Sequence, residues 1–205
     1  PCTLEVQQTG TLILRSQVNF CLVASIATTQ QDCSFEISRL LHKCILTCPR
    51  RWTELVFLCI GSDRATGDCL GPYVGHQLNT FCLPGAYVYG TLAHPVHALN
   101  LAETHQKILF QHLDSLIIAI DASLGQKKHL GYVTIANGAL YPGAAVHKKL
   151  PPVGHIHITG IVNIAGTLEQ LTLQTTRLST VISIAEQIAG GILMTIPKAD
   201  IMQTL

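Results

Sequence analysis

The chain has 205 residues, of which 48% are hydrophobic and only 12% are charged, and its formal net charge is +1. A chain of this length has enough residues for one domain with a large core, and it buries roughly 70% of its unfolded surface. The small net charge argues against nucleic-acid binding, and no apolar stretch approaches the about 20 uncharged residues of a membrane span.

Residues 1–33 differ from the rest of the chain because they contain few charges and many Thr and Gln. Even-numbered positions from Leu12 to Ile26 are nearly all apolar, and this period of two predicts a half-buried strand or hairpin. We expect residues 1–33 to be an N-terminal appendage and residues 34–205 to be a single α/β domain. The first helix of that domain should end near Thr47, with Asp32 or Ser34 as its N-cap.

The following elements alternate between strand and helix. Strands are expected at residues 55–61, 86–89, 116–121, 131–136 and 155–161, and helices at residues 70–81, 97–112 and 164–196, the last one broken near residues 175–176. Residues 137–154 contain too many Gly and Pro residues for regular structure. Continuously apolar strands are typical of parallel sheets covered on both faces. The pattern therefore predicts an α/β fold, a three-layer α/β/α sandwich with a doubly wound, mostly parallel sheet.

Acidic residues follow two of the expected strands. Residues 55–61 lead into a loop with Asp63 and Arg64 that reaches Asp68 where the next helix begins, and residues 116–121 end in Asp121. Ligands bind at the carboxyl ends of strands in open α/β sheets, and successive strands of such sheets are often neighbours. We therefore expect Asp68 and Asp121 to face one crevice. Their repulsion would keep one protonated and the other ionised, a pair that can activate water and protonate a leaving group.

Other side chains offer further chemistry near this crevice. His155 and His157 alternate along an expected strand, and His147 lies beside Lys148 in the Gly/Pro-rich loop. A histidine joined to the two aspartates would complete a metal site, and Arg64 or Lys148 would stabilise a developing oxyanion. The simpler interpretation also stays open: the aspartates only cap the following turn and helix, the histidines pack in the core, and the cations are solvated.

Nucleophilic and nucleotide-binding sites have weaker support. Ser62 and Ser123 lie on loops without a Gly-x-Ser-x-Gly elbow, and no Gly-x-Gly-x-x-Gly or Walker pattern follows the strand at residues 55–61. Cys69 is placed for a lowered pKa at a helix N-terminus, although burial as a small hydrophobe is the more frequent arrangement. Cys44 and Cys48 lack a second Cys/His pair at zinc spacing. The cysteines therefore indicate reduced thiols and a cytoplasmic location.

Five segments of the chain carry a family resemblance: CIGSDRATGDCLGP, YGTLAHPVHALNL, IIAIDASLG, LYPGAAVHKKLPPVG and HIHITGIVNIAGTLEQLTLQTTRL. Over residues 34–191 the sequence resembles the YyaC-type family of sporulation proteins or spore proteases. That family is similar to the germination protease of spores and, more distantly, to hydrogenase maturation endopeptidases. The resemblance implies the phosphorylase/hydrolase-like α/β/α fold of those enzymes.

The resemblance also implies roles for particular residues. Germination protease cleaves small acid-soluble spore proteins with carboxylates in Asp-Ala-Leu-Gly-Pro and Ile-Asp-Ala motifs. Residues 68–72 resemble the first motif, with Cys69 in place of the alanine, and residues 120–122 match the second. The resemblance thus assigns catalysis to Asp68 and Asp121. Hydrogenase maturation endopeptidases bind nickel through two acidic residues and a histidine. If a divalent metal is bound here, the expected ligands are Asp68, Asp121 and His147.

These observations lead to one expected function and two alternatives. We expect a sporulation- or germination-associated peptidase that needs no cofactor and hydrolyses a spore protein or precursor in the sporulating cell or spore. Its expected partner is a protein or peptide such as a small acid-soluble spore protein, with no nucleic acid or membrane, and homo-oligomerisation stays open. The alternatives are a metal-assisted endopeptidase and a non-catalytic sporulation factor that binds peptides in the same cleft.

Overall fold

The computed structural model of the protein describes residues 3–6, 12–15, 23–142 and 150–200. The strands are β1 (Thr3–Val6), β2 (Leu12–Arg15), β3 (Val23–Ala27), β4 (Glu54–Cys59), β5 (Ala86–Tyr89), β6 (Ser115–Gly125), β7 (Tyr132–Asn137) and β8 (Ile156–Ile164). The α-helices are α1 (Cys33–Thr47), α2 (Leu70–Leu78), α3 (Leu101–Gln111), α4 (Glu169–Gln174) and α5 (Leu178–Asp200).

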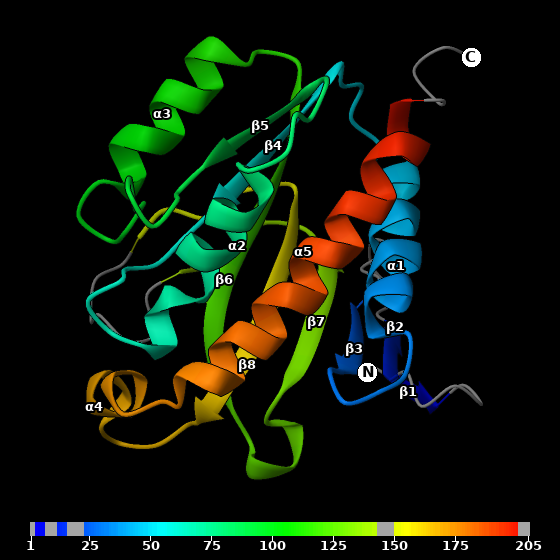
Figure 1. The fold of residues 1–205 in the computed structure, drawn as a ribbon. Coiled ribbons are helices and arrows are strands. Elements are labelled where there is room, and N and C mark those ends of the chain that lie inside the picture. Colours follow the sequence, from blue (N-terminus) through cyan, green and yellow to red (C-terminus); the bar gives the residue numbers. More distant parts are fainter. Residues whose placement is uncertain (1–2, 7–11, 16–22, 143–149, 201–205) are drawn as a thin grey trace.

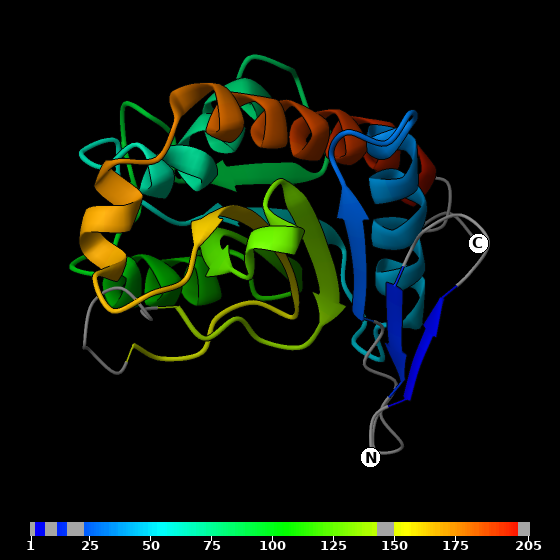
Figure 2. The ribbon, with the colours of Figure 1, turned by 90° about the horizontal axis from the view of Figure 1, so that it is seen from below.

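All eight strands belong to one sheet with the order β1-β2-β3-β7-β8-β6-β4-β5. The four strands β5, β4, β6 and β8 are parallel to one another, whereas β7 pairs antiparallel with β8, and β3 pairs antiparallel with β7. Helices α1, α2 and α5 cover one face, and α3 covers the other (Figures 1 and 2). The predicted three-layer α/β/α sandwich with a mostly parallel sheet from β3 to β5 is therefore confirmed.

Strand β4 explains why the central strands are continuously apolar. Leu55, Phe57 and Cys59 face the core beneath α1, α2 and α5, and Val56 and Leu58 face the core beneath α3. Because successive side chains of a strand point to opposite faces, a strand between two helix layers needs an apolar residue at every position. The same alternation continues along β6.

The N-terminal strands extend the sheet beyond β7. Strand β3 pairs with β7 from Val23 to Ala27, and β2 and β1 follow as an antiparallel meander. Ala24 and Ile26 are fully buried in the core beneath α1 and α5. Of the segment with period two, residues 12–15 and 23–27 are strands, and residues 16–22 lie outside the described residues.

Several expected boundaries were wrong for identifiable reasons. Helix α2 ends at Leu78 rather than residue 81, and α3 begins at Leu101 because the preceding Val96 pairs as a strand with Ile60. Residue 164 belongs to β8, so the last helical region begins only at Glu169, although the predicted break separates α4 from α5. The N-cap position Asp32 has a φ of 68° and makes no side-chain capping bond.

Helix α5 was expected to be a core helix, and its packing agrees with this. Residues 178–196 are long and apolar enough to cross a membrane by length and composition alone. However, half of this stretch is buried, and α5 packs against α1 and α2. A core helix meets the same criterion, so the hydropathy of α5 is weak evidence for a membrane span.

Two glycines allow the end of β4 to contact the start of α2. A Cβ at Gly61, whose φ is +140°, would clash with the carbonyl oxygen of Asp68, and a Cβ at Gly71 would clash with the carbonyl oxygen of Ile60. The backbones of the strand end and the helix start therefore lie in direct contact.

The substitution Gly61→Ala tests this contact. We expect it to lower the free energy of unfolding by about 3 kcal/mol, because the new methyl group meets backbone atoms and the φ angle is unfavourable for alanine. Urea denaturation followed by circular dichroism measures the change. Gly166→Ala is the control, since a Cβ at Gly166 meets nothing within 4 Å. Equal unfolding free energies for the two variants would contradict the proposed constraint.

Candidate active site

Three backbone segments end side by side at the carboxyl edge of the parallel strands. The Ile60 N–H donates to the Ile120 carbonyl at 2.7 Å, and the Gly61 N–H donates to the Val96 carbonyl at 2.8 Å. Ile60 and Val96 also form a parallel bridge outside the named strands. Asp121 follows Ile120 along the chain, and His97 follows Val96. Asp121 and His97 are thereby placed on the two sides of the end of β4.

Asp68 reaches the same place through the loop after β4. A 3-10 turn, Gly67–Cys69, leads directly into α2 and carries Asp68. The Ser62 N–H donates to the Asp68 backbone carbonyl at 3.1 Å. Because Gly61 has no side chain, the Asp68 backbone lies directly against the strand end.

Asp68 and Asp121 line one cavity with a volume of about 220 Å³. Other polar side chains in its wall come from His97, Ser123, Thr159 and Glu169, and its apolar wall includes Leu140, Tyr141, Pro142, Leu150 and Leu173. This size suits a short segment of a ligand rather than a large cofactor. The cavity therefore contains both aspartates where the sheet topology places ligand sites.

The Asp121 carboxyl group has the more strongly shifted pKa of the two. Burial raises its pKa well above the usual range, and the negative charge of Asp68 raises it further. The Ala122 N–H donates to Asp121 Oδ1 at 2.8 Å, which acts in the opposite direction. Asp121 therefore favours its protonated form.

The surroundings of the Asp68 carboxyl group favour its ionised form more than those of Asp121 do. Burial raises its pKa, but the Ser62 backbone N–H and the nearby His97 ring both counteract this shift. The Leu99 N–H donates to His97 Nδ1 at 3.3 Å, so the neutral ring carries its proton on Nε2. The pair is thus asymmetric: Asp68 is the more readily ionised member, and Asp121 is the more readily protonated one.

The remaining sequence-predicted residues are not all at the cavity. Asp63 and Arg64 are exposed and do not line it. The His157 Nδ1 is 3.0 Å from the Gly138 carbonyl, away from the aspartates. His147 and Lys148 lie outside the described residues, within the gap of residues 143–149.

Sequence reasoning missed two residues of the site, His97 and Glu169. His97 was expected in the first turn of a helix, but the Val96–Ile60 bridge holds it at the sheet edge instead. The proline at position 95 is a local signal that the helix starts later. Glu169 reaches the cavity from the start of α4, which packs against the turn that carries Asp68. No local pattern marks this contact.

A metal ion was considered at sequence level, with Asp68, Asp121 and His147 as ligands. Across residues 3–6, 12–15, 23–142 and 150–200, no three His, Cys, Asp or Glu side chains are grouped to hold a metal. The described residues thus supply Asp68 and Asp121 but no complete ligand set. We derive no chemical step through a metal.

Cys69 is poorly suited to be a nucleophile. Burial raises the pKa of its thiol, and the carboxylates of Asp63 and Asp68 raise it further. The reactive form of cysteine is the thiolate, which this environment disfavours. Cys69 is one of the free, buried cysteines of the described chain.

The raised pKa of Asp121 leads to a testable pH dependence of stability. The folded state binds this proton more tightly than the unfolded state, where the pKa of Asp is about 3.9. The resulting stabilisation is complete below that pKa and is lost as the pH rises through the folded-state pKa. Asp121→Asn should therefore gain stability relative to the wild type as the pH rises from about 4 to 8.

Urea unfolding at several pH values measures this difference. Asp63→Asn is the control, because Asp63 is exposed and lies outside the cavity. Its stability curve should follow that of the wild type. A constant difference between Asp121→Asn and the wild type at all pH values would contradict the assignment.

Comparison with known proteins shows the family of the chain and supports its fold. Residues 25–191 match a family described as "Protein of unknown function (DUF1256)". The chain is 47% identical over 141 residues to the uncharacterized protein YyaC of Bacillus subtilis strain 168, and the match covers 69% of each chain. The expected relationship to YyaC is thus confirmed, whereas the link to spore proteases stays a prediction.

A solved structure supports the fold. The [NiFe] hydrogenase maturation protease HycI from Thermococcus kodakarensis KOD1 superposes with a TM-score of 0.50 and 17% sequence identity, over 78% of this chain and 99% of that one. At this level of identity the likeness shows the fold and not the activity. On the sequence matches, the chain belongs to the DUF1256 family of proteins of unknown function.

Proposed function

We propose that the protein is a peptidase in which Asp68 and Asp121 activate a water molecule for attack on a peptide bond. The observation that carries this proposal is the half-buried, mutually repelling pair of carboxyl groups in one cavity at the carboxyl edge of the sheet. Structural capping alone does not need two acids to face the same cavity, and their burial is unfavourable for stability.

The asymmetry of the pair assigns a role to each acid. Ionised Asp68 accepts a proton from water while the water oxygen bonds to the scissile carbonyl carbon. Protonated Asp121 donates its proton to the carbonyl oxygen, which gives a neutral gem-diol. The C–N bond then breaks as Asp68 passes its proton to the leaving amine and Asp121 recovers a proton from a hydroxyl group. Both carboxyl groups end in their starting states.

His97 acts as a positioning residue for Asp68 in this proposal. The charge of its protonated ring counteracts the upward shift of the Asp68 pKa, and in the neutral ring Nδ1 accepts the bond from Leu99 N–H. A second bond, from the His97 backbone N–H to Asn100 Oδ1 at 2.8 Å, fixes the turn before α3. The ring therefore favours the ionised form of Asp68 that general-base catalysis requires.

The substrate that we propose is a spore protein or precursor, such as a small acid-soluble spore protein, in the cytoplasm of the sporulating cell or spore. Support comes from the Asp68 and Asp121 motifs, which resemble those of germination protease, and from membership of the family that includes YyaC of Bacillus subtilis. The proposal for the substrate is separate from the proposal for the chemistry.

The direct test is incubation of the purified protein with the acid-soluble protein fraction of spores, followed by mass spectrometry of new termini. Asp68→Asn and Asp121→Asn should each reduce cleavage about 10³-fold, because each removes one partner of the general acid–base pair. Asp63→Asn, on the exposed loop of the same segment, should cleave like the wild type.

Three outcomes of this experiment would contradict the proposal. Absence of new termini with the wild-type protein would favour a peptide-binding factor, and loss of cleavage on addition of a chelator would favour a metal-assisted reaction. Retained cleavage in both asparagine variants would remove the aspartate pair from the mechanism.

The pH dependence of cleavage provides a second test. The reaction needs ionised Asp68 and protonated Asp121, so kcat/KM should follow a bell-shaped curve with apparent pKa values of the coupled pair. Both limbs should lie above the ordinary Asp pKa of about 3.9, because both pKa values are raised. A profile without an alkaline limb would contradict the role of protonated Asp121.

A further inference from the structure

Strand β5 lies at the edge of the sheet, next to β4 on one side only. Figure 1 shows it between the helices α2 and α3. Its sequence, Ala86-Tyr87-Val88-Tyr89, contains no charge and no proline. Edge strands usually carry a charged residue or a proline, because their unpaired backbone groups otherwise pair with other chains. The edge of β5 is therefore open to strand pairing.

The register of β4 and β5 identifies the unpaired backbone groups. Leu55 N–H donates to the Gly85 carbonyl, and Leu55 is the register partner of Ala86. In a parallel pair, alternate residues direct both backbone groups to the neighbouring strand. Tyr87 and Tyr89 therefore pair with β4, and the N–H and C=O of Val88 point away from the sheet. Within the described residues, no partner is recorded for these two Val88 groups.

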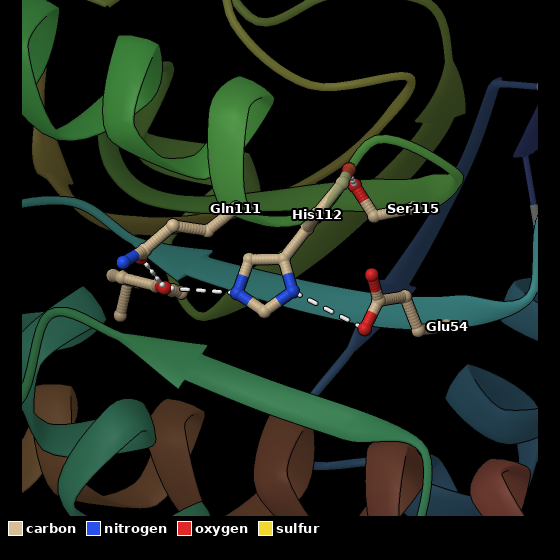
Figure 3. Close-up of polar contacts among 5 residues, drawn as sticks. Glu54, Gln111, His112 and Ser115 are labelled. Carbon is tan, nitrogen blue, oxygen red and sulfur yellow. Dashed lines mark hydrogen bonds and ion pairs between the residues drawn. The ribbon is translucent and has the colours of Figure 1, made fainter.

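A hydrogen-bonded cluster holds β5 in place at this edge. The Tyr89 hydroxyl lies 2.9 Å from His112 Nε2 and 3.1 Å from Gln111 Oε1, and His112 Nδ1 lies 3.2 Å from Glu54 Oε2 (Figure 3). The Tyr87 ring packs on the His112 ring with a centroid distance of 4.3 Å. The strand is thus tied to the end of α3 and to the start of β4, which keeps its outer edge in a fixed position.

Two neighbouring pockets lie beside β5, and one of them shares a lining residue with the active-site cavity. The first pocket lies along Ala86–Tyr89 and shares Asn79, Val88 and Tyr89 with the second, which has a volume of about 560 Å³. The second pocket extends to His97. His97 also lines the cavity with Asp68 and Asp121. The edge strand and the carboxylate pair are therefore connected by a series of pockets, each of which shares lining residues with the next.

We propose that β5 binds an extended segment of the substrate polypeptide as an additional strand, with the peptide continuing past His97 to the aspartate pair. This inference rests on the proposed peptidase function for its orientation toward the site. An extended polypeptide is the ligand whose own N–H and C=O groups, at every second residue, match those of Val88. Side chains of the substrate would contribute selectivity through contacts with these pockets.

The experiment measures binding without cleavage, in the Asp68→Asn background. The probes are overlapping peptides of about twelve residues from small acid-soluble spore proteins, long enough at about 3.3 Å per residue to cover β5 and reach the cavity. Val88→Pro removes the outward N–H without removing a bond to β4, and Val88→Ala is the matched control that keeps the N–H. Val88→Pro should weaken binding about tenfold, and Val88→Ala should bind within about twofold of the parent.

A second measurement covers the case in which Val88→Pro fails to fold, as judged by its circular dichroism and Tm. Peptides methylated on alternate backbone nitrogens are bound to the parent protein. One set of alternate positions should abolish binding and the other should not, because only one edge of an added strand bonds to β5. Equal effects at all positions, equal binding by both Val88 variants, or no binding of any peptide would overturn the inference.

The same peptides separate this inference from the proposed function. Edge-dependent binding with no cleavage by the wild-type protein would support docking on β5 and contradict the peptidase. Cleavage by the wild type, with binding that is unchanged in Val88→Pro, would support the peptidase and overturn docking on β5.

Discussion

The site depends on the close contact between the end of β4 and the start of α2. At Gly61 the space of a side chain is occupied by the backbone of Asp68, and at Gly71 it is occupied by the carbonyl of Ile60. Because of this contact, the turn that carries Asp68 packs directly against the end of β4. Since β6 is the hydrogen-bonded neighbour of β4, Asp121 is then close enough for its charge to interact with that of Asp68.

Burial of two acids at one place is unfavourable, and the rest of the fold must offset it. The two cores on either face of the sheet provide that stability, with β4, β6 and β8 contributing apolar side chains to the layer beneath α1, α2 and α5. The unfavourable effect of burial is also unequal for the two acids. Ser62 and His97 both counteract the upward shift of the Asp68 pKa, whereas Asp121 accepts one backbone hydrogen bond, from Ala122. One environment therefore produces two carboxyl groups with different protonation, which a symmetric pair could not do as simply.

Local sequence patterns predicted those site residues whose positions are determined within one βα unit. The apolar runs of β4 and β6, each followed by an acidic residue, were sufficient to predict that Asp68 and Asp121 face one crevice. His97 was not predictable in this way, because its place depends on the pairing of Val96 with Ile60, 36 positions earlier in the chain. The extent of β8 was also underestimated: its last residues pair with β6 beyond a register shift at Ser123 and Leu124. Long-range pairing overrides local propensity at such positions.

The open edge of β5 and the aspartate pair impose a common requirement on any polypeptide that uses both. A chain paired with Val88 must be extended, and its N–H and C=O groups must be free of other structure. Folded segments do not meet this condition, so the surface would select unfolded tails and linkers before side-chain identity matters. His97 stands at the junction, since its ring contributes to the charge balance of Asp68 while it also lines a pocket beside β5. A peptide that displaces solvent at His97 would therefore alter the ionisation of Asp68, which couples substrate docking to the readiness of the base.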